Sequence, residues 1–499
     1  MIGRLLIANR GEIALRIIRA CNELGIGTVA VYSEADRLEP HARAADQAVC
    51  LGPPPAADSY LRIAAVIEAA LATGADAIHP GYGFLAENPQ FAEACADAGL
   101  VFVGPTPDAM RRMGSKIGAR QLMADAGVPV VPGATPSDQS DAAFAACATQ
   151  VGYPVLIKAS AGGGGKGMRT AAHAGELREA LASARHEARA AFGDDTLYLE
   201  RLIAHARHIE VQLLADHHGG IVHLFERDCS TQRRHQKIIE ESPSPALTPA
   251  LRAAMGEAAV AAARAVGYRN AGTIEFLLEG TGEGAHFYFL EMNTRLQVEH
   301  PVSEAIAGVD LVHAQLRVAS GLALPWTQAD LRARGHAIEC RIYAEDPASG
   351  FLPQAGRIER WRAPCRPGVR IDAGVETGSD VSVFYDPMLA KLIVHAETRD
   401  AAIARCRAAL AEFVVLGIAT NIGFLMRVLD HEAFRNGTLD TGFLDREGSA
   451  LAIDPPLPAA AIAAAIAHTD TPTFDSAGDR SPAGLDPWTT LTGWRSDHA

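Results

Sequence analysis

The chain has 499 residues, and 48% of them are hydrophobic, which is enough for two or three domains with sizeable cores. Its formal net charge of −14 argues against a general nucleic-acid-binding protein, because such proteins need a basic surface to displace counterions from phosphate. The eight cysteines form no CxxC pair, so we expect reduced thiols in a cytoplasmic protein. We also expect neither a secretory signal nor a membrane span, since no apolar run approaches the roughly 20 residues that a span requires.

The first part of the chain alternates short apolar runs, which are typical of buried strands, with apolar residues at helical spacing. This alternation predicts a doubly wound α/β domain. The GxGxxG fingerprint is absent after the first expected strand, which disfavours a Rossmann-type dinucleotide cofactor. The expected elements are strands at 4–8, 27–32, 75–79 and 100–103 and helices at 11–24 and 59–72.

Three further regions follow this domain. A stretch rich in Pro and Gly at 128–133 marks a boundary, and a small α/β unit with a glycine-rich segment extends beyond it. Alternating patterns then predict a larger, mostly antiparallel sheet with strands at 208–214, 272–278 and 287–298. The last residues are rich in Ala, Pro, Asp and Thr, as in a linker or tail. The expected regions are therefore 1–113, 114–203, 204–447 and 448–499.

The segment from Glu291 to Glu299 carries the most informative pattern, because every second residue in it is polar. On an extended chain, a period of two places Glu291, Asn293, Arg295, Gln297 and Glu299 on one face. A solvated strand face shows the same pattern and is the commoner explanation in an arbitrary sequence. The combination of metal-ligand types, an arginine and a further carboxylate favours a functional face.

Two residues of this segment also predict a metal site. Mg²⁺ or Mn²⁺ takes oxygen ligands from one or two carboxylates together with nucleotide phosphates. Glu291 and Asn293 offer such oxygens, and Glu275 lies on the nearby expected strand. Alone, Glu275 would more simply be an ion-paired core carboxylate.

A glycine-rich segment at 161–168 suits a backbone that lies against phosphate oxygens. It is not a Walker P-loop, because Ser160 stands where that motif needs Gly and Gly167 stands where it needs Ser or Thr. A plain flexible loop is the alternative. Lys158 ends the strand before the loop and is placed to reach a phosphate, whereas Lys116 is weaker evidence and is most often a surface lysine.

A dense cationic run from Gln232 to Lys237 stands out in this acidic chain. Such runs are usually solvated faces, but its place between two expected strands favours a basic pocket for small anions. His208 alternates with apolar residues together with Glu210 and Gln212, so its imidazole is expected to face the same cleft. A structural histidine is nearly as good an explanation.

Together these motifs resemble the biotin carboxylase family of the ATP-grasp superfamily, from Arg4 to about Leu444. The resemblance is carried by four segments, at 7–14, 78–85, 226–237 and 291–301. It implies an N-terminal doubly wound α/β domain, a mobile lid domain with the glycine loop, and a C-terminal domain with a mostly antiparallel sheet. The family often has Lys where Arg201 stands and an extra Gly where Ala161 stands, and neither departure puts a role in doubt.

The resemblance also implies roles for individual residues. Lys237, Arg295, Gln297 and Val298 would bind bicarbonate, Glu299 would be the base that acts on it, and Arg341 would face biotin. Glu275, Glu291 and Asn293 would hold Mg²⁺ or Mn²⁺, two ions being expected. Thr441 would be a peripheral nucleotide contact. The implied ATP-binding residues are Lys116, Lys158, Gly164, Gly165, Glu200, Arg201, Leu202, Ile203, His208, Gln232, His235, Glu275, Leu277 and Glu291.

The implied reaction converts ATP, bicarbonate and biotin into ADP, phosphate and carboxybiotin through carboxyphosphate. The chain contains no Met-Lys-Met biotin acceptor, so biotin is expected as a substrate on a carrier protein or domain, with a carboxyltransferase as a further partner. A homodimer or larger complex is expected from the family. The rivals are another ATP-grasp ligase that forms carboxyphosphate, of the carbamoyl-phosphate synthetase type, and a nucleotide-binding regulatory protein without catalysis. The complete charged set from Glu275 to Arg341 argues against the second rival.

Overall fold

The computed structural model describes residues 2–160 and 168–453. Its N-terminal part is a parallel sheet of five strands in the order β3-β2-β1-β4-β5. This confirms the predicted doubly wound α/β domain. The strands are β1 (Arg4–Ile7), β2 (Gly27–Ser33), β3 (Gln47–Gly52), β4 (Ala77–His79) and β5 (Val101–Phe102), and the helices are α1 (Gly11–Leu24), α2 (Pro40–Ala44), α3 (Ile63–Thr73), α4 (Pro89–Asp97) and α5 (Pro107–Gly114).

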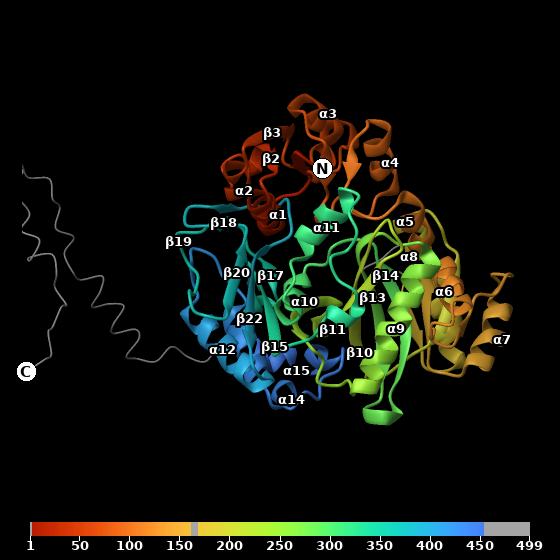
Figure 1. The fold of residues 1–499 in the computed structure, drawn as a ribbon. Helices are drawn as coiled ribbons and strands as arrows, with labels where there is room; N and C mark the ends of the chain where they lie inside the picture. Colours follow the sequence, from red (N-terminus) through yellow and green to blue (C-terminus); the bar gives the residue numbers. More distant parts are fainter. Residues whose placement is uncertain (1, 161–167, 454–499) are drawn as a thin grey trace, which may run out of the picture. The chain divides into compact units, whose positions relative to one another are not determined.

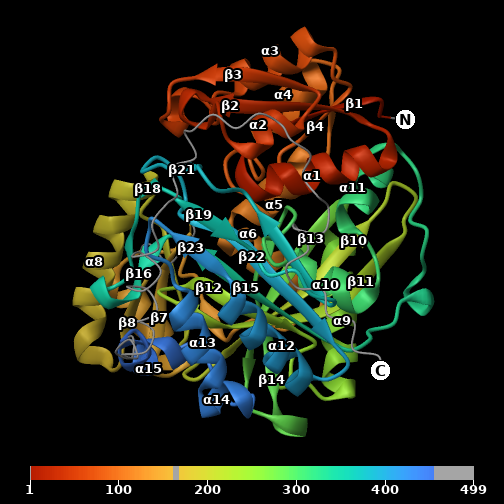
Figure 2. The same cartoon turned by 90° about the vertical axis from the view of Figure 1, so that its left-hand side faces the viewer.

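A second sheet is antiparallel, in the order β6-β9-β7-β8, and its strands β7 and β8 lie beside α8 at the left of Figure 2. Two helices cover it, and their apolar residues, such as Phe144 and Leu181, bury Ile157 and Leu199 of the sheet. The strands are β6 (Gly133–Ala134), β7 (Val155–Ala159), β8 (Arg169–Ala171) and β9 (Leu197–Arg201), and the helices are α7 (Asp141–Val151) and α8 (Ala174–Phe192), with α6 (Lys116–Asp125) leading into the unit.

The largest sheet of the described residues is antiparallel throughout, in the order β14-β13-β10-β11-β12-β15-β22-β20 (Figure 1). It confirms the mostly antiparallel sheet expected for the C-terminal region. Its strands are β10 (Arg207–Ala215), β11 (Ile221–Arg233), β12 (Gln236–Ser242), β13 (Asn270–Glu279), β14 (His286–Asn293), β15 (His336–Tyr343), β20 (Val369–Ala373) and β22 (Met388–Ala396).

The two faces of this sheet differ in chemistry. Ile209, Val211 and Leu213 of β10 pack against α9, and Ile338, Cys340 and Ile342 of β15 pack against α12. The residues between them point to the opposite face, where α10 lies against β11, β12, β15 and β22. The helices are α9 (Pro249–Val266), α10 (His300–Ala307), α11 (Leu311–Ala319), α12 (Arg399–Glu412), α13 (Ile422–Asp430), α14 (Glu432–Arg435) and α15 (Phe443–Leu451).

Short strand pairs complete the C-terminal part around the large sheet. They pair β16 with β17, β18 with β21, and β19 with β23. Their bounds are β16 (Glu345–Asp346), β17 (Leu352–Pro353), β18 (Gly356–Arg357), β19 (Arg360–Arg362), β21 (Asp380–Val381) and β23 (Val414–Leu416).

Two expectations about local structure are wrong. The strand predicted over 287–298 ends at Asn293, because the backbone N–H of Thr294 donates to Glu87 and the chain then turns into α10. The predicted tail does not begin at 448, because α15 continues to Leu451. Most of the expected tail, residues 454–499, lies outside the described residues.

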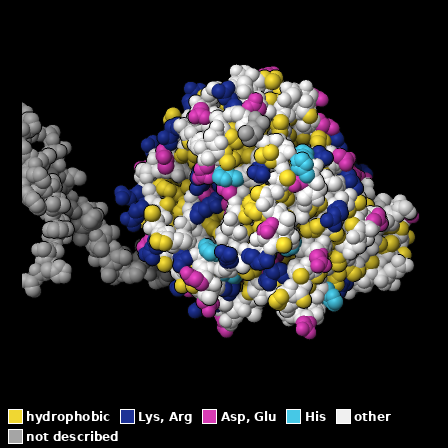
Figure 3. Space-filling model, in the orientation of Figure 1, with side chains coloured by type: hydrophobic (Ala, Val, Ile, Leu, Met, Phe, Trp, Pro, Cys, Tyr) yellow, Lys and Arg dark blue, Asp and Glu magenta, His cyan; other side chains and the backbone are white. Residues whose placement is uncertain are grey.

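Surface composition matches the acidic but mixed character of the sequence. On the face drawn in Figure 3, basic and acidic side chains are interspersed rather than gathered in one patch. Across residues 2–160 and 168–453, none of the helices combines the length and the apolar character needed to cross a membrane. All eight cysteines fall in these ranges and are free thiols, with the sulfur atoms of Cys340 and Cys406 3.5 Å apart.

We predict that Phe424→Ala destabilises the fold by about 3–5 kcal/mol, because Phe424 is fully buried and packs edge-on against Phe351. The free energy of unfolding from urea titration measures this change. Phe384→Ala is the matched control, since Phe384 is 47% exposed and its truncation should change stability by less than about 1 kcal/mol. Equal losses in the two variants would contradict the assignment of Phe424 to the core.

Candidate functional site

Charged side chains gather on the face of the large sheet that carries α10. Glu291 of β14 pairs in register with Glu275 of β13, and Glu275 pairs with Glu210 of β10. Residues directly opposite one another on antiparallel strands project to the same side. Three carboxylates therefore lie in a row across three strands.

Lys237 of β12 lies against two of these carboxylates. Its Nζ donates to Glu210 Oε2 at 2.6 Å, to Glu275 Oε1 at 2.9 Å and to Glu299 Oε1 at 2.6 Å. Arg341 of β15 donates to the other oxygen of Glu299 at 2.9 Å. We call Glu210, Lys237, Glu275, Glu299 and Arg341 the Lys237 cluster.

A register shift in β12 brings Lys237 to this face. Gln232 pairs with Lys237 and Thr231 pairs with Ile239, so Ile238 is an extra residue in β12. Ile238 and Ile239 both join the hydrophobic core, which strict alternation along a strand would not permit. The bulge therefore places Lys237 on the polar face of the sheet.

The β11–β12 turn consists of two residues, Arg234 and His235, with φ of 49° and 66°. Positive φ at both central positions is the type I′ hairpin geometry, which ordinarily uses Asn and Gly. Side chains larger than these are strained in this region, and such strain is frequent at functional sites. His235 is exposed at the turn, whereas Gln232 beside it is buried.

Arg227 of β11 is the buried foundation of the cluster. It pairs with Glu210, and its Nη1 also donates to Gln212 at 2.7 Å and to Ser303 of α10 at 3.0 Å. Its remaining donor reaches Thr273 at 3.2 Å. Because a buried guanidinium is costly unless its donors are used, this set of partners fixes where Glu210 lies.

The loop at 294–299 brings its polar side chains together although it is not a strand. Arg295 donates to Gln297 Oε1 at 2.7 Å and to Asn293 Oδ1 at 3.2 Å. Gln297 Nε2 donates in turn to Glu275 Oε1 at 3.2 Å. Arg295 is also held from outside the sheet by Glu87, at 3.0 Å. The sequence pattern thus selected residues that meet, but the single strand face it implied is wrong.

The charges of the cluster shift the pKa values of its members. Burial alone would lower the pKa of Lys237, but Glu210, Glu275 and Glu299 raise it well above its ordinary value. Burial would raise the pKa of Glu299, but Lys237 and Arg341 hold it well below its usual range. Glu240 is the other partner of Arg341 and accepts from its Nε at 2.6 Å. Burial raises the pKa of Glu240 to about 7.

The expected nucleotide-binding residues lie partly together. Lys158 donates to Glu200 at 2.6 Å, and Lys116 is close enough to Glu291 and Lys158 for their charges to act on its pKa, which burial lowers. Ile203 packs in one small apolar cluster with Leu277. Nε2 of His208 lies 2.9 Å from Oε2 of Glu275. Arg201 and Leu202 lie at the end of β9, where Arg201 pairs with Glu279. Gly164 and Gly165 lie outside the described residues.

Several site residues were missed from the sequence. The alternation around His208 includes Glu210 without assigning it a role, and Arg227 and Glu240 lie in or just after the segment 226–237 without an assigned role of their own. Glu87 gave no sequence signal, because it meets Arg295 from a position 208 residues earlier in the chain.

The residues present fit a divalent metal. Glu275 and Glu291 face each other in register, and the pKa of Glu291 is raised by burial and by the charge of Glu275. A hard cation that prefers oxygen ligands would remove the repulsion between two such adjacent carboxylates. Asn293 adjoins it, since its Nδ2 donates to Glu275 at 2.7 Å.

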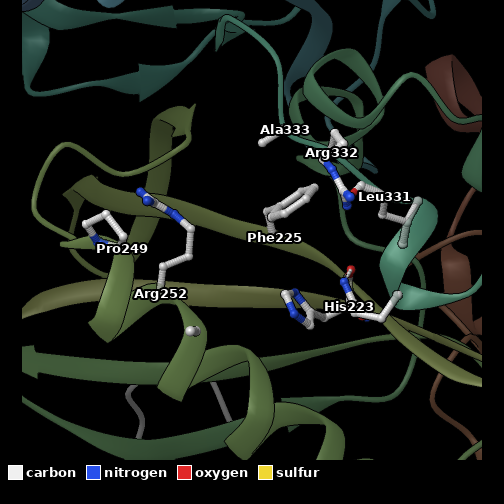
Figure 4. A pocket seen from close by; sticks show the side chains of 9 residues that line it. His223, Phe225, Pro249, Arg252, Leu331, Arg332 and Ala333 are labelled. Carbon is white, nitrogen blue, oxygen red and sulfur yellow. Dashed lines mark hydrogen bonds between the residues drawn. The ribbon is translucent and has the colours of Figure 1, made fainter.

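A cavity of about 360 Å³, drawn in Figure 4, has no residue of the Lys237 cluster in its lining. His223 and Phe225 of β11, Arg252 of α9 and Leu331 and Arg332 form its walls. Both arginines are already occupied: Arg252 pairs with Glu226, and Arg332 donates to two backbone carbonyls. The charged residues suited to chemistry are therefore on the sheet face and not in this cavity.

Comparison with known proteins shows similarity over most of the chain. Residues 1–110 match the model "Biotin carboxylase, N-terminal domain", 115–327 match "Carbamoyl-phosphate synthase L chain, ATP binding domain", and 339–446 match "Biotin carboxylase C-terminal domain". Biotin carboxylase 1 of Bacillus subtilis is 52% identical over 89% of this chain and 98% of its own length. The mitochondrial methylcrotonoyl-CoA carboxylase subunit alpha of rice (Oryza sativa subsp. japonica) is also 52% identical, and the chain spans 60% of it.

Two solved structures are similar in fold. The biotin carboxylase domain of Hydrogenobacter thermophilus 2-oxoglutarate carboxylase, in complex with MgADP, ADP and bicarbonate, has a TM-score of 0.86 and 44% identity, over 91% of this chain and 99% of that one. A biotin carboxylase–β-γ-ATP complex from Campylobacter jejuni has a TM-score of 0.86 and 46% identity, over 89% of this chain and 99% of that one.

We predict that Lys237→Met destabilises the protein by about 3–5 kcal/mol at pH 7.5, because three buried carboxylates lose their shared cation. In the parent, the depressed pKa values of Glu275 and Glu299 contribute stability above the unfolded value near 4.3, and this contribution is lost as the pH falls through the lower folded values. Without Lys237, burial and mutual repulsion raise these pKa values, so the variant loses stability as the pH rises.

The difference in unfolding free energy between parent and variant should therefore shrink from pH 7.5 to pH 5, as measured by urea titration at both pH values. Arg366→Met, which breaks an exposed pair with Glu412, is the control and should show little change at either pH. A gap between Lys237→Met and parent that is independent of pH would speak against this electrostatic account.

Proposed function

The chain belongs to the biotin carboxylase family, and we propose that it uses ATP and bicarbonate to carboxylate biotin, with the Lys237 cluster as the reaction centre. It is an ATP-dependent ligase. The single observation that carries the proposal for the site is the shared carboxylate of Glu299, which accepts from Lys237 on one oxygen and from Arg341 on the other. Glu299 thus holds the side chains of Lys237 and Arg341 close to each other. This arrangement suits a reaction in which Lys237 binds bicarbonate and Arg341 binds biotin next to it.

We assign bicarbonate to the position among Lys237, Arg295, Gln297 and the backbone of Val298. Arg295 presents a planar fork that suits the oxygens of a small anion, and Gln297 orients it. Bicarbonate then attacks the γ-phosphate of ATP and forms carboxyphosphate, a step in which a protein contributes mainly by positioning and by neutralising charge. The cations around Glu299 are suited to both tasks.

ATP is assigned to the space between the second sheet and the large sheet. Lys116 and Lys158 would contact its phosphates, together with His208, Gln232, His235 and the glycine loop. Glu200, Arg201, Leu202, Ile203 and Leu277 would line its adenine pocket, which the apolar contact of Ile203 with Leu277 supports. The region at 114–203 would act as the lid over the nucleotide.

Glu275, Glu291 and Asn293 are the residues that would hold Mg²⁺ or Mn²⁺. A bound metal would neutralise charge on the phosphates of the nucleotide. In the described structure both oxygens of Glu275 are occupied, one by Lys237 and the other by His208. We therefore propose that Lys237 turns from Glu275 toward bicarbonate when the substrates bind.

Glu299 is proposed as the base, and its environment sets a condition on that role. A carboxylate with a pKa near 4.3 faces a gap of roughly 8 kcal/mol against bicarbonate, whose second pKa is roughly 10. Lys237 and Arg341 lower the pKa of Glu299 further and widen this gap. Proton loss must therefore be concerted with attack on the phosphate, or Lys237 and Arg295 must favour the dianion.

The second half of the reaction involves Arg341 and partners outside the 499 residues. Carboxyphosphate would release CO₂ and phosphate, and the phosphate would take the ureido N–H proton of biotin. We propose that Arg341 contacts the ureido oxygen, which carries the negative charge of the resulting enolate until the nitrogen attacks CO₂. Biotin would arrive on a carrier protein or domain, and a carboxyltransferase would take the carboxyl group onward. The acyl acceptor is a property of that partner.

ADP release should require bicarbonate and Mg²⁺ together, because bicarbonate is the phosphoryl acceptor and the metal completes the Glu275–Glu291 site. A coupled ADP assay in buffer freed of CO₂, with and without added bicarbonate, measures this requirement. Glu291→Gln should raise the Mg²⁺ concentration needed for half-maximal rate, since it removes one ligand charge. Equal ADP release with and without bicarbonate would refute the proposal.

Arg341→Ala should separate the two half-reactions. Losing one preorganised donor at a developing oxyanion costs about 3 kcal/mol, or roughly a hundredfold in rate, and only the biotin step develops this charge. Bicarbonate-dependent ADP release should therefore stay within about tenfold of the parent, while carboxybiotin formation falls much further.

The control for this test is Arg407→Ala. Arg407 is an exposed residue of α12 that pairs with Asp430 of α13, and its loss should change neither activity. A parallel loss of both activities in Arg341→Ala, with circular dichroism unchanged, would place Arg341 in the bicarbonate or nucleotide site instead.

A further inference from the structure

Lys391 is a fully buried lysine beside the Lys237 cluster, and the proposed reaction does not use it. It lies on β22 directly opposite Arg341 of β15, so both side chains project to the polar face of the sheet. Its Nζ donates to the backbone carbonyl of Val298 at 2.8 Å and lies 3.1 Å from Glu12 Oε1. The hydrogen bond of Lys391 to the proposed bicarbonate loop is therefore made to the backbone.

The peptide that accepts from Lys391 helps to set the positions of two side chains of the site, those of Gln297 and Glu299. Val298 lies between Gln297, which donates to Glu275, and Glu299, which accepts from Lys237 and Arg341. The carbonyl of Gln297 is fixed from the other side by Nδ1 of His300, at 2.7 Å. A rotation of either peptide would swing the neighbouring side chains away from the cluster.

Glu12 is in turn fixed by the N-terminal domain. It stands in the first turn of α1 and is 4% exposed, and the hydroxyl of Tyr82 donates to the same oxygen that faces Lys391. The start of α1 also meets the chain just after β20 without an intervening side chain, since a Cβ on Gly374 would lie 2.7 Å from the backbone nitrogen of Glu12. Glu12 therefore has little freedom to move.

Packing alone does not account for a lysine at this position. A buried ammonium is costly unless it is paired, and a methionine would fill a similar volume without that cost. Glu12, Glu339 and Asp372 supply negative charge around Lys391, and Arg370 opposes it. Glu339 finds no hydrogen-bond donor among the described residues, so the direct partners that the structure gives Lys391 are Val298 and Glu12.

We infer that Lys391 and Glu12 are positioning residues for the bicarbonate site: the N-terminal domain, through Glu12, holds the ammonium that fixes the Val298 peptide. The inference rests on the proposed assignment of bicarbonate to the 294–299 loop. Lys391 acts through the backbone and touches no substrate, so its loss should affect the site that the loop builds more than the site that binds ATP.

Lys391→Met should raise the KM for bicarbonate by tenfold or more and leave the KM for ATP within about threefold of the parent. It should also lower the Tm, because Glu12 loses its buried counter-ion. The double variant Lys391→Met/Glu12→Gln removes both charges and should recover most of the lost Tm. The Val298 carbonyl still lacks its donor in the double variant, so the raised KM for bicarbonate should remain.

This split between stability and KM distinguishes positioning from a merely structural role. If the double variant recovered the parental KM together with its Tm, or if Lys391→Met raised both KM values equally, the inference would be wrong. Arg252→Met, which breaks the half-buried pair with Glu226, is the matched control and should lower the Tm with an unchanged KM for bicarbonate.

The parent enzyme separates the two levels of the argument. If it shows no bicarbonate-dependent ADP release, the assignment of bicarbonate to the loop fails, and the inference falls with it. If the parent depends on bicarbonate and Lys391→Met behaves like the parent, only the role of Lys391 is overturned.

Discussion

The ammonium group of Lys237 keeps three buried carboxylates together in the absence of substrates. Glu210, Glu275 and Glu299 come from two strands and a loop, and each pair of such charges near 4 Å repels by about 4 kcal/mol at an effective dielectric constant of 20. Lys237 compensates the charges of all three, and Arg227 pairs in addition with Glu210 and Arg341 with Glu299. The fold therefore has to deliver Lys237 to this point, and much of the sheet architecture can be understood as doing so.

The same alternation along the strands builds both the core and the site. On β10 and β15 one set of residues is aliphatic and packs under α9 and α12, while the residues between them carry the charges. A strand that is well anchored on its apolar face has little freedom to shift, because a slip of one residue would bury the charged set. Stability and the geometry of the charged cluster are thus coupled through the period of the strand. The Lys391–Val298 contact extends this order to a loop that has no ladder of its own.

The sequence predicted most of the chemistry and less of the geometry. Periodicity was sufficient for four of the five strands of the parallel sheet and for β10 and β13, because buried strands have strong apolar patterns. It missed β3, whose side chains are largely exposed at the edge of the sheet. The polar residues from Glu291 to Glu299 were predicted to converge, and they do, but through a loop tied to Glu87. Contacts over 208 residues, like that of Arg295 with Glu87, leave no local pattern to read.

The bulge at Ile238 gives spacing a role of its own. Lys237 and Glu240 reach the same face because one additional residue lies between the pairs made by Gln232 and Thr231. If the strand alternated strictly, the three positions that separate Lys237 from Glu240 would place these two side chains on opposite faces, and Lys237 would point toward the aliphatic core. A variant without Ile238 would keep Lys237 and Glu240 on the same face by alternation alone, because two positions would then separate them. The bulge is thus what allows two successive core residues, Ile238 and Ile239, to stand between two residues of the polar face.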